Sequence, residues 1–198
     1  MTAASNGRAR LVILISGRGS NMVSILEAID AKQLSADIVA VISNRPDAAG
    51  LVAAADRGIA TAAVDHTEYQ DRDSFDRALA ESIDRFNPDL VILAGFMRIL
   101  TADFVNHYSD KLLNIHPSLL PKFKGLNTHQ RAIDEKEAEH GATVHFVTAE
   151  LDDGPIVLQA RVPVLTDDDA TTLAKRVLVE EHQLYPNAIK KIIQERVF

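Results

Sequence analysis

Three short, almost continuously aliphatic segments constrain the fold of this chain most: Leu11–Ile15, Val39–Ile42 and Leu90–Ala94. Strands covered on both faces have this composition, because neither face meets water. Between the second and third segments, apolar residues recur at helical spacing across residues 73–86, and Asn87-Pro88 predicts the end of that helix. Alternating strands and helices are typical of a mostly parallel sheet with helices on both faces, so the sequence predicts an α/β fold.

The second half of the chain breaks this alternation. Residues 142–147 and 155–164 both have strand character without an intervening helical segment, so we expect an antiparallel pair that closes the sheet. A last helix is expected from about Ala170. Pro186 should kink or interrupt it, which leaves Asn187–Phe198 as a further helical segment.

Length and composition limit the kind of protein. The 198 residues and 46% hydrophobic content fit one globular domain, 1–198, with residues 1–9 as a flexible tail. The net charge of −7, without a long run of Lys and Arg, argues against a nucleic-acid partner. The absence of cysteine excludes a thiolate nucleophile and a disulfide framework. The apolar run after the polar N-terminus is too short for a signal peptide or membrane span, so we expect a cytoplasmic protein with small-molecule partners.

Residues 114–121 have the character of a reactive site. If Leu112–His116 is a strand, alternation places Asn114 and His116 on the same face, where both can reach one reacting group, and directs Ile115 into the core. Pro117 and Pro121 then fix two φ angles and remove two backbone donors, which restricts the loop that follows. The sequence therefore predicts an amide and an imidazole at the end of a strand.

The segment Ser16–Asn21, with sequence SGRGSN, lies between the first expected strand and a helix. Its glycines allow a sharp turn, and Gly19, Ser20 and Asn21 would offer backbone N–H groups to a phosphate at the helix N-terminus. The alternative is an ordinary strand-to-helix turn with Ser20 or Asn21 as N-cap. Met22 stands where a dinucleotide fingerprint needs glycine, and no Lys-Ser/Thr pair follows, so a mononucleotide-like phosphate fits better.

An acidic turn, Glu150–Pro155, follows the first strand of the expected antiparallel pair. This turn could place Asp152 beside His116, where a carboxylate would favour imidazolium and orient the ring. For Asp153 a solvated acidic turn is the better interpretation, and His145 remains open between a structural and a catalytic role. No histidine pattern typical of a metal site occurs, so we expect no bound metal.

Together these motifs resemble one family, the folate-dependent phosphoribosylglycinamide formyltransferases of purine biosynthesis. The resemblance extends from Arg10 to about Gln194. It includes SGRGSN, AGFMRIL (94–100), LLNIHPSLLP (112–121), HGATVHFV (140–147), ELDDGP (150–155) and EEH (180–182). It implies the Rossmann-like formyltransferase fold and transfer of a formyl group from 10-formyltetrahydrofolate, as co-substrate, to the glycinamide amine of the ribonucleotide, without a metal. A monomer or a homodimer is expected.

The resemblance also implies roles for individual residues. The catalytic group would be Asn114, His116 and Asp152, with Thr143 and His145 in support. The ribonucleotide would contact Gly19, Ser20, Asn21, Arg72, Gly95, Pro117 and Glu181. The folate would contact Met97, Arg98, Ile99, Leu100, Thr148, Glu150 and Leu151, although Arg98 could also be a surface cation. Residues 10–100 would then form the phosphate and ribonucleotide half, and residues 101–198 the catalytic and folate half.

Two residues depart from the family pattern, and two other functions remain open. Lys124 stands where proline is common, and Asn127 stands where histidine is frequent, which bears on loop rigidity and on the titration of His116. A 10-formyltetrahydrofolate hydrolase would use the same catalytic residues with water as acceptor, but it needs no phosphate site. A non-catalytic nucleotide-binding protein would keep the phosphate site but would not need the Asn-His-Asp set.

Overall fold

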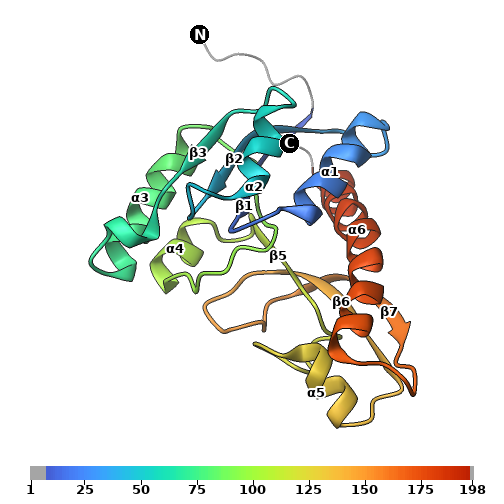
Figure 1. Ribbon diagram of the computed structural model, residues 1–198. Helices are drawn as coiled ribbons and strands as arrows, with labels where there is room; N and C mark the ends of the chain where they lie inside the picture. The colour runs from blue at the N-terminus through green and yellow to red at the C-terminus, as the bar shows by residue number, and fades with distance from the viewer. Residues whose placement is uncertain (1–7, 197–198) are drawn as a thin grey trace.

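A computed structural model describes residues 8–196, which form a seven-stranded sheet with helices on both faces (Figure 1). The strands are β1 (Ala9–Ile15), β2 (Ala36–Ser43), β3 (Thr61–Ala63), β4 (Leu90–Leu93), β5 (Leu112–His116), β6 (Glu139–Phe146) and β7 (Ile156–Pro163). Their order is β3-β2-β1-β4-β5-β6-β7. The first five are parallel, whereas β6 runs antiparallel to β5 and β7. The predicted α/β sheet with a C-terminal antiparallel pair is confirmed.

Alternate residues of the central strand supply two separate cores. In β1, Leu11, Ile13 and Ile15 face the core that includes residues of α1 and α6, whereas Val12 and Leu14 face the core that includes residues of α3 and α4. Because all five side chains are 0% exposed, the continuous apolar sequence of β1 follows from its two covered faces. The helices are α1 (Ser20–Asp30), α2 (Ala49–Ala55), α3 (Arg72–Asp84), α4 (Ala102–His107), α5 (Thr128–Asp134) and α6 (Ala170–Glu195), with a 3₁₀ turn, η1, at His66–Glu68.

The C-terminal helix differs from the prediction. Helix α6 continues from Ala170 to Glu195 through Pro186, so the separate segment expected at Asn187–Phe198 is wrong, and residues 197–198 lie outside the described part. Tyr185, next to the proline, is 0% exposed, and its hydroxyl donates to the carbonyls of Leu93 (2.9 Å) and Leu113 (3.2 Å). Packing of this turn against the sheet offsets the local cost of proline in a helix.

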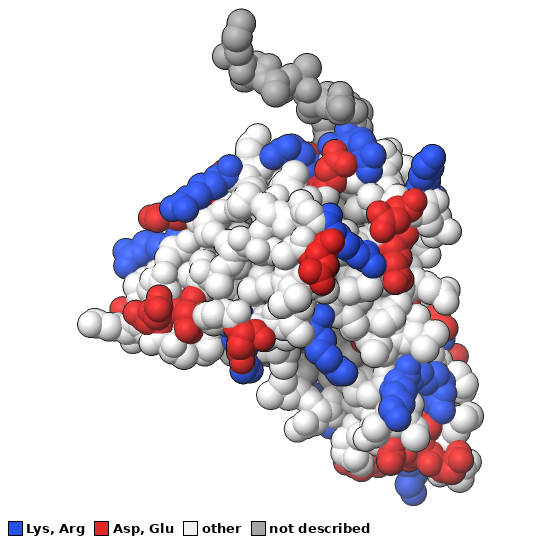
Figure 2. Space-filling model, turned by 45° about the horizontal axis from the view of Figure 1, so that its top comes forward, with Lys and Arg blue, Asp and Glu red and all other residues white. Residues whose placement is uncertain are grey.

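The N-terminal boundary also moves. Ala9 already lies in β1 and is 1% exposed, so Ala9 is not part of the tail expected at residues 1–9, of which residues 1–7 lie outside the described part. Acidic and basic side chains are interspersed over the face shown in Figure 2. Among residues 8–196, no helix combines the length and apolar character needed to cross a membrane.

Candidate active site

The sheet register places three loops side by side. Leu14 of β1, Leu93 of β4 and Asn114 of β5 are paired in one row. The chain therefore leaves three adjacent parallel strands at the same edge, which is where α/β sheets bind ligands. The glycine-rich segment follows β1, the Gly95 loop follows β4, and the proline-containing loop follows β5.

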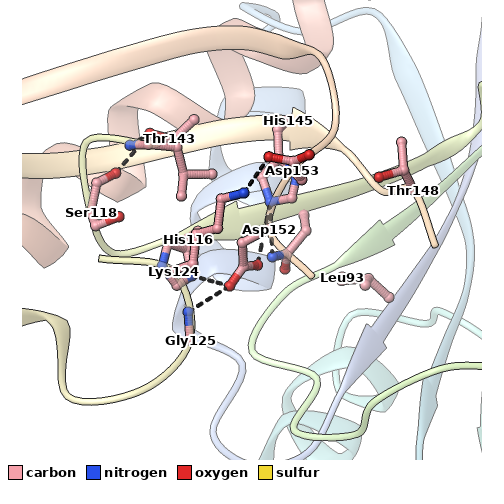
Figure 3. A network of polar contacts seen from close by, with 12 residues as sticks. Leu93, His116, Ser118, Lys124, Gly125, Thr143, His145, Thr148, Asp152 and Asp153 are labelled. Carbon is pink, nitrogen blue, oxygen red and sulfur yellow. Dashed lines mark hydrogen bonds and ion pairs between the residues drawn. The ribbon is translucent and has the colours of Figure 1, made fainter. Parts of the chain in front are cut away.

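Asn114 and His116 lie on one face of β5. His116 meets Asp152 from the turn between β6 and β7 (Figure 3), and Asn114 is joined to this group through His145. The His116 side chain is 7% exposed, and its Nδ1 lies 3.4 Å from Oδ2 of Asp152. The same carboxylate oxygen accepts a hydrogen bond from the Gly125 N–H at 2.9 Å. Ile115, between the two polar residues, is 8% exposed in the core, as strand alternation predicted. The structure thus brings the three predicted catalytic residues together.

The imidazole of His116 is held in one tautomer. Its Nε2 lies 2.8 Å from the Phe123 carbonyl, which can only accept, so Nε2 carries a hydrogen. Nδ1 therefore carries a hydrogen only in the charged ring. The 3.4 Å separation from Asp152 exceeds the usual charged hydrogen-bond length of about 2.7–2.9 Å, so Nδ1 makes no close contact with that carboxylate.

His145 orients the amide of Asn114. The two residues are register partners, and Nδ2 of Asn114 lies 3.3 Å from Nε2 of His145. His145 Nδ1 donates to the carbonyl of Phe146 at 2.9 Å, and burial lowers the pKa of His145, so its Nε2 is an acceptor. One N–H of Asn114 is then bound by His145, and the other remains for a ligand. This contact fits the supporting role expected for His145.

Thr143 supports the loop that follows His116. The Thr143 side chain is 0% exposed, and its hydroxyl donates to the Ser118 carbonyl (2.7 Å) and accepts from the Leu120 N–H (3.1 Å) and from Gln159 Nε2 (2.9 Å). Gln159 also donates to the Leu120 carbonyl at 2.9 Å. Because Thr143 pairs with His116 across the sheet, these bonds fix the loop where it leaves the catalytic strand.

Thr143→Val should destabilise the protein by about 1–3 kcal/mol, because it leaves the buried Leu120 N–H and Ser118 carbonyl without the hydroxyl. Urea unfolding measures this loss. Thr61→Val is a matched control, since Thr61 is exposed in strand β3. Equal stability of the two variants would contradict the role assigned to the Thr143 hydroxyl.

The glycine-rich segment forms one wall of a cleft of about 410 Å³. Gly19 has φ +68°, which favours glycine, and it precedes α1 without a side-chain cap, so the alternative of Ser20 or Asn21 as N-cap is wrong. The first intrahelical bond joins the Val23 N–H to the Gly19 carbonyl, so the N–H groups that precede Val23 have no partner within the helix. The lining residues are Ser16–Asn21, Asn44, Arg45, His66, Ala94, Gly95, Met97 and Arg98.

Glu181 joins this cleft through Asn21. Glu181 is 8% exposed, and its Oε2 accepts from Nδ2 of Asn21 at 2.8 Å. Burial raises the pKa of Glu181, although the Asn21 hydrogen bond opposes this shift. Gly95 lines the cleft, whereas two other expected ribonucleotide residues do not: Arg72 is exposed at the start of α3, and Pro117 follows His116 with its carbonyl accepting from the Thr128 hydroxyl at 2.6 Å.

The expected folate residues lie on two segments with large exposed apolar side chains. On the segment after β4, Met97 is 72% exposed and Ile99 is 63% exposed, whereas Leu100 packs partly against a core. The Arg98 guanidinium lies over the Phe75 ring at 5.7 Å, so this cation packs against the protein. On the turn after β6, Leu151 is 58% exposed, and Thr148 and Glu150 are exposed as well.

Three cleft residues were missed from the sequence: Asn44, Arg45 and His66. Asn44 and Arg45 directly follow strand β2, which neighbours β1. A signal was present, because polar residues at the carboxyl end of a parallel strand beside the phosphate loop are candidates for ligand contact. His66 comes from the turn after β3, and the sequence offers no comparable signal for it.

A buried histidine, His140, packs against the partly exposed His129. His140 is 1% exposed, its ring centroid is 5.1 Å from that of His129, and neither of its nitrogens has a partner among residues 8–196. Burial and the neighbouring His129 lower the pKa of His140 from 6.5 to about 4. Its ring also packs at 6.0 Å against that of Phe123, whose carbonyl holds His116.

The depressed pKa of His140 predicts acid sensitivity. Between its ordinary pKa of 6.5 and about 4 the unfolded chain binds the proton more readily, so the free energy of unfolding falls as pH falls. The expected loss from this residue is about 1–2 kcal/mol between about pH 7 and about pH 5. Urea unfolding at both pH values should show a smaller loss for His140→Leu than for the wild type. His107→Gln, at an exposed histidine, should behave like the wild type.

The two departures from the family pattern lie in the same loop. Lys124 forms an ion pair with Asp153, which joins the loop to the turn that carries Asp152 (Figure 3). Asn127 is the N-cap residue of α5 with φ +57°, a conformation that asparagine tolerates, and its side chain makes no capping hydrogen bond. Where a proline would restrain the loop backbone, Lys124 instead links the loop through its side chain to the turn Glu150–Pro155.

Residues 9–189 match the formyl transferase family, so the chain belongs to that family. It is 49% identical to the phosphoribosylglycinamide formyltransferase of Escherichia coli K12 over 90% of this chain and 84% of that protein. A solved phosphoribosylglycinamide formyltransferase from Coxiella burnetii is 46% identical and has a TM-score of 0.90, over 96% of this chain and 89% of that chain. The bovine trifunctional purine biosynthetic protein adenosine-3 is 44% identical over 93% of this chain, which spans 18% of that protein. The predicted resemblance, fold and formyltransferase class are confirmed.

Proposed function

We propose that this protein transfers the formyl group of 10-formyltetrahydrofolate to the amine of 5'-phosphoribosylglycinamide in purine biosynthesis. The products are the N-formyl ribonucleotide and tetrahydrofolate. The observation that carries this proposal is the position of Asn114, His116 and Asp152 at the sheet edge that also bears the glycine-rich segment Ser16–Asn21 and its cleft. Formyl transfer to an amine on a phosphorylated substrate needs both parts.

The chemistry follows from the charges that develop. The amine attacks the formyl carbon, so negative charge forms on the formyl oxygen and positive charge on the amine nitrogen of a tetrahedral intermediate. The free N–H of Asn114 and the Nδ1–H of charged His116 would donate to that oxygen. Asp152 would accept the amine proton through an ordered water and return it to the folate N10 as the C–N bond breaks. No covalent enzyme intermediate is required.

The substrates would occupy adjacent parts of the cleft. The phosphate would bind the N–H groups of Gly19, Ser20 and Asn21, and Glu181 would accept from ribose hydroxyls, with Gly95 and Pro117 beside the ribonucleotide. Folate would use the backbone of 97–100 and of 148–151. Arg72 has weaker support, since it is exposed and is not among the residues that line the cleft.

The experiment follows deformylated folate by absorbance after 10-formyltetrahydrofolate is mixed with protein, with and without the ribonucleotide. Release that depends on the ribonucleotide is the expected result. Release without it would indicate the hydrolase, and ribonucleotide binding without release, measured by calorimetry, would indicate a non-catalytic binding protein. Either of these outcomes would overturn the proposal.

A further inference from the structure

The segment Met97–Thr101 is held at both ends by side-chain oxygens from distant parts of the chain. The Met97 N–H donates to the Ser16 hydroxyl at 2.7 Å, and the Thr101 N–H donates to Oδ2 of Asp76 at 2.6 Å. Ser16 is 8% exposed and Asp76 is 3% exposed. Between these anchors the segment forms no helix or strand, and Met97 and Ile99 project into solvent. Its backbone position therefore depends on the two anchors.

Ser16, which anchors Met97, is also the first residue of the glycine-rich segment Ser16–Asn21. Its hydroxyl donates to Oδ1 of Asn44 at 2.6 Å while accepting from Met97, and its own N–H donates to the Gly95 carbonyl at 3.2 Å. One buried hydroxyl thus joins the start of the glycine-rich segment to the segment after β4. A shift of either segment changes the geometry of the other.

Burial of the Asp76 carboxylate lowers the free energy of unfolding of the protein. It lies on α3 beside apolar core residues, and its second oxygen, Oδ1, has no hydrogen-bond partner among residues 8–196. Burying a carboxylate with an unmatched oxygen costs free energy that an apolar side chain would not cost. The contact that Asp76 does make is to the backbone of Thr101, the residue that caps α4 and ends the segment.

We propose that Ser16 and Asp76 are positioning residues that fix the two ends of the segment Met97–Thr101, where folate would bind. Ser16 also couples this segment to the glycine-rich segment Ser16–Asn21, where the phosphate would bind. This inference rests on the proposed function, because it assigns folate to residues 97–100. Asp76 would act on folate binding alone, since it contacts only the far end of the segment. Ser16 would act on both substrates.

The test measures KM for each substrate, and kcat, in variants that lose or keep the oxygen acceptor. Asp76→Leu removes the acceptor in a form suited to an apolar site, and it should raise the folate KM by about 5–30-fold with little change in the ribonucleotide KM. Asp76→Asn keeps an acceptor oxygen and should restore most of the affinity. Glu81→Ala, at an exposed carboxylate on the same helix, is the control.

Ser16→Ala should raise both KM values, and calorimetry should show that the ribonucleotide changes folate affinity less than in the wild type, because linkage between the sites is reciprocal. Ser24→Ala, at a buried serine of α1 whose hydroxyl donates to the Asn21 carbonyl, is the matched control.

Equal changes of both KM values in Asp76→Leu, or no recovery in Asp76→Asn, would overturn the role of Asp76. An unchanged folate KM or unchanged linkage in Ser16→Ala would overturn the role of Ser16. If an acceptor-removing variant does not fold, the other anchor and Asp76→Asn still test the proposal, since Asp76→Asn should keep most of the wild-type folate affinity. If the wild type itself shows no ribonucleotide-dependent release, the proposed function fails, and folate titration of the same variants tests the anchors separately.

Discussion

The Asp152→Asn variant should turn over about 10²–10⁴-fold more slowly than the wild type while it still binds both substrates. The side-chain amide of this variant can accept the Gly125 hydrogen bond but cannot take up the proton of the attacking amine. The substitution also removes the negative charge beside His116. Asp152 has φ +49°, which asparagine adopts more readily than most residues, so the backbone should be retained. Single-turnover rates with saturating substrates measure the effect.

Asp153→Asn is the matched control for this change. Asp153 has a side chain that is 52% exposed and pairs with Lys124, so its loss should change kcat by less than about threefold. If Asp152→Asn kept more than about a tenth of wild-type kcat, the proton-transfer role of Asp152 would be refuted.

His116→Ala should also fold and lose about 10²–10³-fold in kcat, because the ring nitrogen that the proposed mechanism assigns to the formyl oxygen disappears. The substitution also removes the hydrogen bond that the Phe123 carbonyl accepts from His116 Nε2 in the wild type. His116→Gln is informative beside it, since an uncharged amide can bond that carbonyl without placing positive charge near the oxygen.

The comparison of the two variants separates loop support from charge. If charge at His116 drives the reaction, His116→Gln stays nearly as slow as His116→Ala while its stability approaches that of the wild type. Recovery of kcat in His116→Gln would show that holding the loop, rather than donating a hydrogen bond from imidazolium, is the main contribution of this residue.

The parts of the fold set by short-range pattern could be predicted from the sequence. Leu112–His116 forms β5 with the expected bounds, because strand alternation has a fixed period that places Asn114 and His116 on one face. The helix over residues 73–86 is observed at Arg72–Asp84, since its apolar spacing matches one buried face. These features depend on neighbours in sequence.

The features that depend on distant contacts could not be predicted. Pro186 did not interrupt α6, because Tyr185 is bonded to carbonyls of two strands. His66 reaches the cleft through the arrangement of β2 and β3, and the tautomer of His116 follows from a loop carbonyl seven residues later. A sequence pattern does not specify such contacts between elements.

The most direct test of direct formyl transfer uses folate labelled with ¹³C in the formyl group, followed by NMR in a single turnover with the ribonucleotide. The mechanism predicts that the label moves from folate to the N-formyl group of the ribonucleotide, with no labelled formate and no labelled protein. Labelled formate as the main product, or a label held covalently on the protein, would contradict direct transfer at Asn114, His116 and Asp152.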